Sequence, residues 1–159
     1  SQMEVFFNEN GRRLIGWDEI LEGGVSSTAV INWWRGDHPE VIANAFVNGN
    51  EVICCPTDYC YLDYNQAKYT TRKLYEASIV PSGIEEDKAK LVKGMQANIW
   101  TEMIPSESRM HFMAFPRAIA LSEKAWTDKQ GYDWDSFVGR LEHSLRRLAF
   151  MGVAYCPLD

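Results

Sequence analysis

The sequence predicts an α/β fold built on a parallel sheet. Short strand-like runs alternate with helical patterns, and the segments between consecutive strands are long enough to cross over the sheet. Such crossovers join parallel strands and are right-handed. With 159 residues the chain can bury a core of ordinary size. We therefore expect one domain over residues 1–159, either a small open α/β layer or part of a (β/α) barrel.

The first third of the chain contains three predicted strands, at residues 13–17, 29–34 and 51–55. A helical lead-in over 2–10 precedes them and is broken by Gly11. Between the second and third strands, Pro39 stands at the first position of a helix whose apolar residues recur at helical spacing. Gly49 is expected to end that helix.

The remaining elements are more widely spaced. Residues 59–69 are aromatic and irregular, which predicts a long loop with a functional role. We then expect a helical turn or two over 85–91 and a fourth strand over 94–100. Residues 107–126 have a helical pattern that Pro116 either kinks or divides. Asp133 is expected to cap a last amphipathic helix that Gly152 ends.

Composition excludes several classes of function. A net charge of −6 provides no basic surface for nucleic acid or for anionic membranes. No apolar run approaches the roughly 20 residues of a membrane span. The four cysteines form no Cys-x-x-Cys pair and no Cys/His spacing typical of metal sites, so we expect buried thiols, no metal and no cofactor. The three histidines fall in helical contexts, and we expect them to be surface or satisfied helix residues.

Aromatic residues follow all four predicted strands, and acidic residues follow three of them. In parallel α/β sheets and barrels, binding and catalytic residues gather at the carboxyl ends of the strands. The segments found there are Trp17-Asp18-Glu19, Trp33-Trp34-Arg35-Gly36, Tyr61-Leu62-Asp63 and Trp100-Thr101-Glu102. An aromatic face for the C–H groups of a sugar ring, beside carboxylate acceptors for its hydroxyls, is typical of a carbohydrate site.

Residue spacing supports this interpretation at two of the strand ends. In an extended chain the side chains of residues i and i+2 point to the same face, so Trp100 and Glu102 would share one space, as would Tyr61 and Asp63. Structural alternatives remain open for each pair. Trp100 and Glu102 could be a core tryptophan beside a helix start, Tyr61 a buried tyrosine with a satisfied hydroxyl, and Asp63 a turn-forming aspartate.

An ordered set of motifs resembles a known enzyme family. The segments are Gly16-Trp17-Asp18-Glu19-Ile20-Leu21, Asn32-Trp33-Trp34-Arg35-Gly36, Tyr61-Leu62-Asp63, Gln96-Ala97-Asn98-Ile99-Trp100-Thr101-Glu102 and Phe115-Pro116-Arg117. Their order and spacing resemble the β-N-acetylhexosaminidases of glycoside hydrolase family 20, over roughly residues 11–155. The resemblance implies a parallel (β/α) half-barrel that corresponds to strands five to eight of a TIM barrel, the C-terminal half of the catalytic domain.

The resemblance also implies a reaction and residue roles. The family removes terminal N-acetylglucosamine or N-acetylgalactosamine from glycans by substrate-assisted retaining catalysis, in which the acetamide oxygen of the substrate attacks the anomeric carbon. By this resemblance Tyr61 positions the acetamide, and Asp63 and Glu102 accept bonds from sugar hydroxyls. The pocket walls would be Trp17, Trp34 and Trp100.

One motif of the family is missing from these 159 residues. Its catalytic Asp-Glu pair lies in a His-x-Gly-Gly-Asp-Glu segment at the end of strand four, and no such segment occurs here. Asp18-Glu19 is adjacent but corresponds to acids after strand five that are not the catalytic pair. We therefore expect this chain alone to supply pocket residues and to be inactive.

Three roles remain open on these grounds: the C-terminal half of a β-N-acetylhexosaminidase, a non-catalytic sugar-binding or assembly module, or a half-barrel whose activity returns with a partner that carries strands one to four. The expected partners are glycans ending in N-acetylhexosamine and the N-terminal half-barrel. Because half a barrel leaves two sheet edges open, we also expect the isolated chain either to form a homo-oligomer, such as a dimer of half-barrels, or to be only marginally stable. The family resemblance suggests a periplasmic, secreted or lysosomal location.

Overall fold

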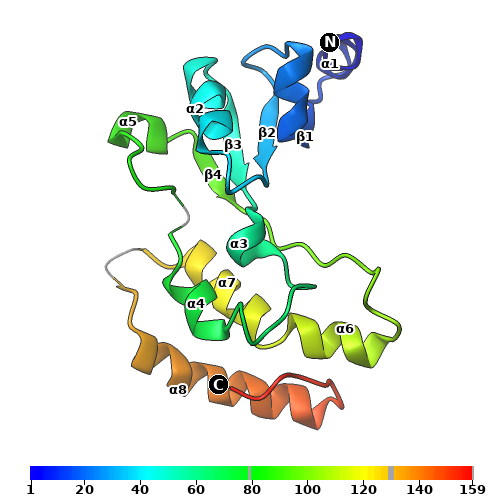
Figure 1. Cartoon of the computed structure of the whole chain (residues 1–159), viewed down its shortest axis with the longest axis vertical. Helices are drawn as coiled ribbons and strands as arrows, with labels where there is room; N and C mark the ends of the chain where they lie inside the picture. The colour runs from blue at the N-terminus through cyan, green and yellow to red at the C-terminus, as the bar shows by residue number, and fades with distance from the viewer. Residues whose placement is uncertain (79, 129–130, 159) are drawn as a thin grey trace. The chain divides into compact units, whose positions relative to one another are not determined.

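The computed structural model of the chain describes residues 1–78, 80–128 and 131–158. These residues form two compact units (Figure 1). Unit 1 comprises residues 1–57 and 78–96, and unit 2 comprises residues 58–77 and 97–159.

Unit 1 contains a four-stranded sheet whose strands are all parallel. The strands are β1 (Ile15–Trp17), β2 (Val30–Trp33), β3 (Glu51–Cys54) and β4 (Val92–Met95), in the order β1-β2-β3-β4 (Figure 1). The helices of this unit are α1 (Gln2–Glu9), the 3-10 helix η1 (Asp18–Gly23), α2 (Pro39–Val47) and α5 (Glu86–Ala89). This arrangement confirms the predicted α/β class with a parallel sheet.

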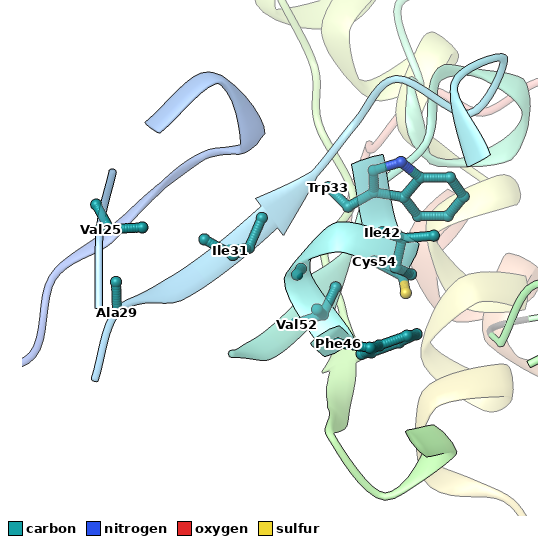
Figure 2. Close-up of a cluster of buried hydrophobic side chains, with 9 residues drawn as sticks. Val25, Ala29, Ile31, Trp33, Ile42, Phe46, Val52 and Cys54 are labelled. Atoms are coloured by element: carbon teal, nitrogen blue, oxygen red, sulfur yellow. The ribbon is translucent and has the colours of Figure 1, made fainter. Parts of the chain in front are cut away.

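The core of unit 1 lies between α2 and the two central strands. Ile42 and Phe46 of α2 pack with Val52 and Cys54 of β3 and with Trp33 at the end of β2 (Figure 2). Helix α2 begins as the sequence predicts, with Pro39 at its first turn. It is followed by Gly49 at a φ of +77°, a left-handed conformation that glycine adopts without steric cost.

Unit 2 is helical. Its helices are α3 (Thr57–Cys60, whose first residue is assigned to unit 1), α4 (Thr71–Glu76), α6 (Glu107–Ala114), α7 (Arg117–Trp126) and α8 (Trp134–Phe150). Tyr75 of α4 stacks on Phe137 of α8 with ring centroids 4.6 Å apart. Ala120 of α7 and the apolar stripe of α8 complete this core, in which Leu141 is fully buried. Burial of one face explains why α8 is amphipathic.

Helix boundaries in unit 2 follow local capping. The side chain of Ser106 accepts a hydrogen bond from the Arg109 backbone N–H at the start of α6. Asp133 does the same for the Ser136 N–H at the start of α8, as predicted. Pro116 separates α6 from α7, so the predicted helical stretch over 107–126 is two helices.

The fourth strand was predicted at the wrong residues. β4 covers Val92–Met95, and residues 96–102 are irregular apart from one isolated parallel bridge between Tyr61 and Asn98. Val52 of β3 pairs with Val92, whereas the next residue, Ile53, pairs with Gly94, so the register shifts by one residue between these two pairs. Gly94 has a φ of 152°, a backbone conformation that other residues rarely adopt. The glycine therefore lies at an irregularity within the strand and does not begin it.

Two further differences concern short helices. The predicted loop over 59–69 begins inside α3, and residues 61–69 are irregular. Helix α4 was not predicted, although Thr70 caps it by accepting from the Lys73 N–H. Its six residues are too few to show a clear helical period in the sequence. Within the described ranges, we find no helix with the length and apolarity needed to cross a membrane.

Candidate functional site

Four of the six predicted site residues line one pocket of unit 2. The pocket has a volume of about 320 Å³ and is lined by Tyr61, Asp63, Tyr64, Trp100, Glu102 and Met103. It combines three aromatic rings, two of which carry a phenol hydroxyl, with two carboxylates. This is the combination of apolar face and polar acceptors that the sequence predicted for a sugar ring.

Backbone pairing brings the two halves of this pocket together. The Leu62 N–H donates to the Asn98 carbonyl at 2.7 Å, and the Asn98 N–H donates to the Cys60 carbonyl at 2.8 Å. These bonds flank the parallel bridge between Tyr61 and Asn98. Trp100 follows Asn98 by two residues, so the bridge places Tyr61 and Trp100 near each other although 39 positions separate them in the chain.

Side chains then fix the geometry within the pocket. One carboxylate oxygen of Asp63 accepts a hydrogen bond from the Trp100 backbone N–H at 3.2 Å. The Tyr61 and Trp100 rings lie 6.5 Å apart between centroids, with an interplanar angle of 40°. Tyr61 is only 8% exposed, whereas Trp100 is 43% exposed. The tyrosine is thus held in the protein, and the indole remains available for contact.

Sequence reasoning missed Tyr64 and Met103 as pocket residues. Tyr64 lies 5.5 Å from Tyr61 between ring centroids, and burial together with the negative charge of Asp63 raises its pKa above 10. It therefore contributes a neutral phenol at physiological pH. The turn after Tyr61 brings it back to the pocket, so the spacing of three between the two tyrosines was the available signal.

Trp34, which belongs to unit 1, is held by a different kind of contact. Its indole Nε1–H donates to both carboxylate oxygens of Glu19, at 3.1 and 3.2 Å. Trp34 directly follows β2, and Glu19 lies in η1, which follows β1. The carboxyl ends of two adjacent parallel strands therefore orient this ring, in the region where the sequence predicted functional residues.

Asp18 supports the same segment from inside unit 1. It is fully buried, and its carboxylate accepts from the backbone N–H groups of Trp34 and Arg35 at 3.1 and 3.3 Å. Arg35 Nε also donates to Asp18, at 2.6 Å. These contacts give Asp18 a structural role in holding the backbone of Trp34 and Arg35.

Trp17 is the last residue of β1 and pairs in register with Asn32 of β2. It is partly exposed. A larger cavity of about 500 Å³ also lies in unit 1, next to Asp18 and Arg35, but none of the six predicted sugar-site residues lines it. We therefore place the candidate site at the smaller, aromatic pocket of unit 2.

In the part of the chain that the structure describes, no group of three or more His, Cys, Asp or Glu side chains is arranged to hold a metal ion. His38 bonds through Nδ1 to Glu40 at 2.8 Å and is half exposed, which is the surface setting expected for it.

Comparison with known proteins identifies the family. Residues 1–129 match the model of the catalytic domain of glycosyl hydrolase family 20. The chain belongs to this family. It is 33% identical to a β-hexosaminidase of Porphyromonas gingivalis over 97% of this chain and 21% of that protein. It is 28% identical to a β-N-acetylhexosaminidase of Cellulomonas fimi over 82% of this chain and 29% of that protein.

Solved structures of family 20 enzymes share the fold. The exo-β-N-acetylglucosaminidase of Vibrio harveyi, in complex with N-acetylglucosamine, superposes with a TM-score of 0.83 at 32% identity and covers 97% of this chain. The β-N-acetylhexosaminidase of Streptomyces coelicolor gives the same TM-score at 25% identity. The chain covers 26% and 36% of those two proteins, respectively.

Family 20 membership confirms the resemblance that the motifs indicated, together with the predicted α/β half-barrel. The chain spans only about a fifth to a third of the relatives it matches. The roles of its individual pocket residues therefore rest on their geometry.

Proposed function

We propose that this chain forms part of the substrate pocket of a β-N-acetylhexosaminidase, an enzyme that hydrolyses terminal N-acetylglucosamine or N-acetylgalactosamine from glycans. The observation that carries the proposal is the shared pocket of Tyr61, Asp63, Trp100 and Glu102 in a chain of family 20. Relatives named for this activity, and a neighbouring structure that contains N-acetylglucosamine, support it.

Each pocket residue has a distinct task in the proposed reaction. Trp100 presents the ring face on which the sugar stacks, which sets the height of the pyranose in the pocket. Asp63 and Glu102 accept hydrogen bonds from hydroxyls at the non-reducing end. Because such bonds require a free terminal sugar, this arrangement favours removal of single terminal residues.

Tyr61 acts on the reacting group itself. Its phenol O–H donates to the acetamide carbonyl and holds the acetamide oxygen below the anomeric carbon. That oxygen attacks carbon 1 as the glycosidic oxygen leaves with a proton, and water then opens the cyclic intermediate with retention of configuration. Holding the acetamide oxygen in a near-attack geometry lowers the activation free energy, because less entropy is lost on reaching the transition state.

We propose that the proton donor and the aspartate that orients the acetamide N–H come from residues outside this sequence. The 159 residues contain no His-x-Gly-Gly-Asp-Glu segment, and Asp18 is occupied by its bonds to Trp34 and Arg35. We further propose that residues 1–159 act as one half of a (β/α)8 catalytic domain.

The proposal includes a partner for the sheet. β1 and β4 are the two edge strands, and Ile15 on β1 is 56% exposed. Open edges of parallel strands pair readily with another strand. In the whole enzyme the partner would be the N-terminal half-barrel, and in its absence we expect two copies of the chain to associate.

Calorimetric titration with N-acetylglucosamine tests the proposed pocket. We expect the chain to bind this sugar and to bind glucose, which has no acetamide, at least about tenfold more weakly. Trp100→Ala should abolish measurable binding. Trp126→Ala is the matched control, because Trp126 is 91% exposed in the same unit and does not line the pocket.

Equal binding of glucose, or full binding by Trp100→Ala, would remove the basis of the proposal. A chromogenic N-acetylglucosaminide separates the catalytic roles. We expect no turnover by the 159-residue chain alone and turnover after addition of a polypeptide that carries strands one to four. Sugar binding without turnover in both cases would instead favour the non-catalytic sugar-binding module.

A further inference from the structure

We propose that Arg117 is a positioning residue for Tyr61 and Asp63. Arg117 does not line the pocket; it acts through the backbone of the segment 61–69, which carries both side chains. Gln66 supports the same segment from within. The inference rests on the proposed function, because it assigns Arg117 a part in the geometry of that sugar pocket.

The guanidinium of Arg117 is buried among backbone carbonyls. Its side chain belongs to the first residue of α7 and is 1% exposed. One terminal nitrogen donates to the carbonyl of Leu62 and, at 2.8 Å, to that of Met113. The other donates to the carbonyls of Tyr64 and Tyr69, at 3.1 and 3.3 Å. Three of the four acceptors lie in the segment 61–69.

This segment needs such a donor. Residues 61–69 form neither a helix nor a strand beyond the single bridge at Tyr61, so their carbonyls lack the regular partners of a helix or a sheet. A buried carbonyl without a partner is strongly unfavourable. A guanidinium offers several donors in a rigid plane and stays charged at any physiological pH, whereas a lysine offers a single flexible ammonium.

The hydrogen bond from Arg117 to the Leu62 carbonyl lies next to the two side chains that it is proposed to position. Leu62 lies between Tyr61 and Asp63, so its carbonyl belongs to the peptide unit that joins the leucine to Asp63. Holding that carbonyl fixes the peptide plane from which the Asp63 side chain projects. Asp63 in turn accepts from the Trp100 N–H, so the constraint extends to the indole across the pocket.

Gln66 ties the same segment to the end of α6. Its Nε2 donates to the carbonyls of Phe112 and Met113, at 2.6 and 3.3 Å. Met113 therefore receives bonds from both Gln66 and Arg117. The amide oxygen of Gln66 is buried and has no hydrogen-bond partner among the described residues. Burying this oxygen destabilises the fold, and the hydrogen bonds that Nε2 donates must offset that loss of free energy.

The test compares positioning with simple stabilisation in the full 159-residue chain. Arg117→Lys keeps the charge but cannot reach all four carbonyls, and Gln66→Leu removes the second support. Leu141→Ala is the control, because Leu141 is fully buried in the helical core of unit 2 and does not line the pocket. The measurements are the melting temperature, the affinity for N-acetylglucosamine at a temperature well below melting, and cross-relaxation between the Tyr61 and Trp100 ring protons.

We expect Arg117→Lys to weaken N-acetylglucosamine binding at least about tenfold and Gln66→Leu about threefold. Cross-relaxation between Tyr61 and Trp100 should fall in both variants. Leu141→Ala should lower the melting temperature at least as much as Arg117→Lys, yet change the affinity less than twofold and leave the ring contact intact.

Wild-type affinity and an unchanged ring contact in Arg117→Lys would overturn the inference, as would an equal affinity loss in Leu141→Ala. If the wild-type chain does not bind the sugar, the proposed function fails for this chain. The ring contact, which needs no ligand, then still decides whether Arg117 and Gln66 position Tyr61 and Trp100. If Arg117→Lys does not fold, Gln66→Leu decides by the same two readouts.

Discussion

The two units of the chain place opposite charges in their interiors. Among the described residues, the buried charged side chains of unit 1 are the acids Glu4 and Asp18, and those of unit 2 are the bases Arg117 and Lys124. In unit 1 the acids accept from backbone N–H groups, and in unit 2 the bases donate to backbone carbonyls. Both units thus use buried charge to order irregular backbone, with opposite polarity.

This difference has a physical consequence for the predicted site residues. The backbone next to Trp34 in unit 1 is held by Asp18, whose carboxylate accepts hydrogen bonds from the N–H groups of Trp34 and Arg35. The backbone next to Tyr61 and Asp63 in unit 2 depends on a guanidinium, which stays charged across the whole working range of pH. The backbone beside the predicted site residues is therefore held by an anion in unit 1 and by a cation in unit 2.

Removing the cation that faces Asp18 should have the largest effect. Arg35→Met leaves a fully buried carboxylate without its ion pair, and we expect a loss of about 3 kcal/mol in the free energy of unfolding. Denaturant unfolding measures this loss. Arg13→Met is the control, since Arg13 pairs with Glu51 in an exposed setting and should cost less than about 1 kcal/mol. Equal losses in the two variants would contradict the role given to burial.

The corresponding change in unit 2 should be somewhat milder. Lys124 is 6% exposed and donates through Nζ to the Tyr75 carbonyl at 2.8 Å. Lys124→Met would leave this carbonyl without that donor, at a cost of about 1–3 kcal/mol. Hydrogen exchange should show the loosening in α4 and α7. Faster exchange confined to the strands of unit 1 would contradict the role of Lys124 in holding α4 within unit 2.

Acidification should produce the smallest change in stability of the three, and this change should depend on Glu4. Hydrogen bonds from the Ser26 hydroxyl and the Ser26 backbone N–H lower the pKa of Glu4 from 4.5 to about 2. Because the folded state has the lower pKa, the stabilisation by Glu4 is complete above pH 4.5 and is lost as the pH falls towards 2. Melting temperatures of the wild type and Glu4→Gln should therefore converge over this interval.

Glu142→Gln, an exposed change of the same charge in unit 2, is the control for that experiment. Its difference from the wild type should show no comparable convergence. A constant gap between the wild type and Glu4→Gln from pH 7 to pH 2 would mean that the Glu4 hydrogen bonds do not stabilise unit 1.

Local chemistry made much of the fold predictable from sequence. Pro39 and Gly49 bound α2, and Asp133 caps α8, because these residues act through their own backbone or nearest neighbours. The fourth strand was misplaced because its end depends on the register with β3, which no local pattern records. The missed helix α4 contributes Tyr75 to a core formed with distant residues of α7 and α8.

The same distinction applies to the site. The grouping of Tyr61, Asp63, Trp100 and Glu102 in one pocket could be predicted from motif order, although Trp100 and Glu102 follow an irregular segment and not a strand. The support of that pocket could not be predicted. Arg117 belongs to a motif visible in the sequence, but its contacts with Leu62 and Tyr64 join residues more than 50 positions apart.

The most direct test of the central claim is a nitrogen-15 NMR titration of the chain with N-acetylglucosamine. We predict saturable shifts of the Trp100 indole N–H and of the backbone amides of Tyr61, Asp63 and Glu102, with no shifts along α8. Shifts that cluster around the larger cavity beside Arg35, or no saturable shift at the four pocket residues, would contradict the assignment of this pocket to an N-acetylated sugar.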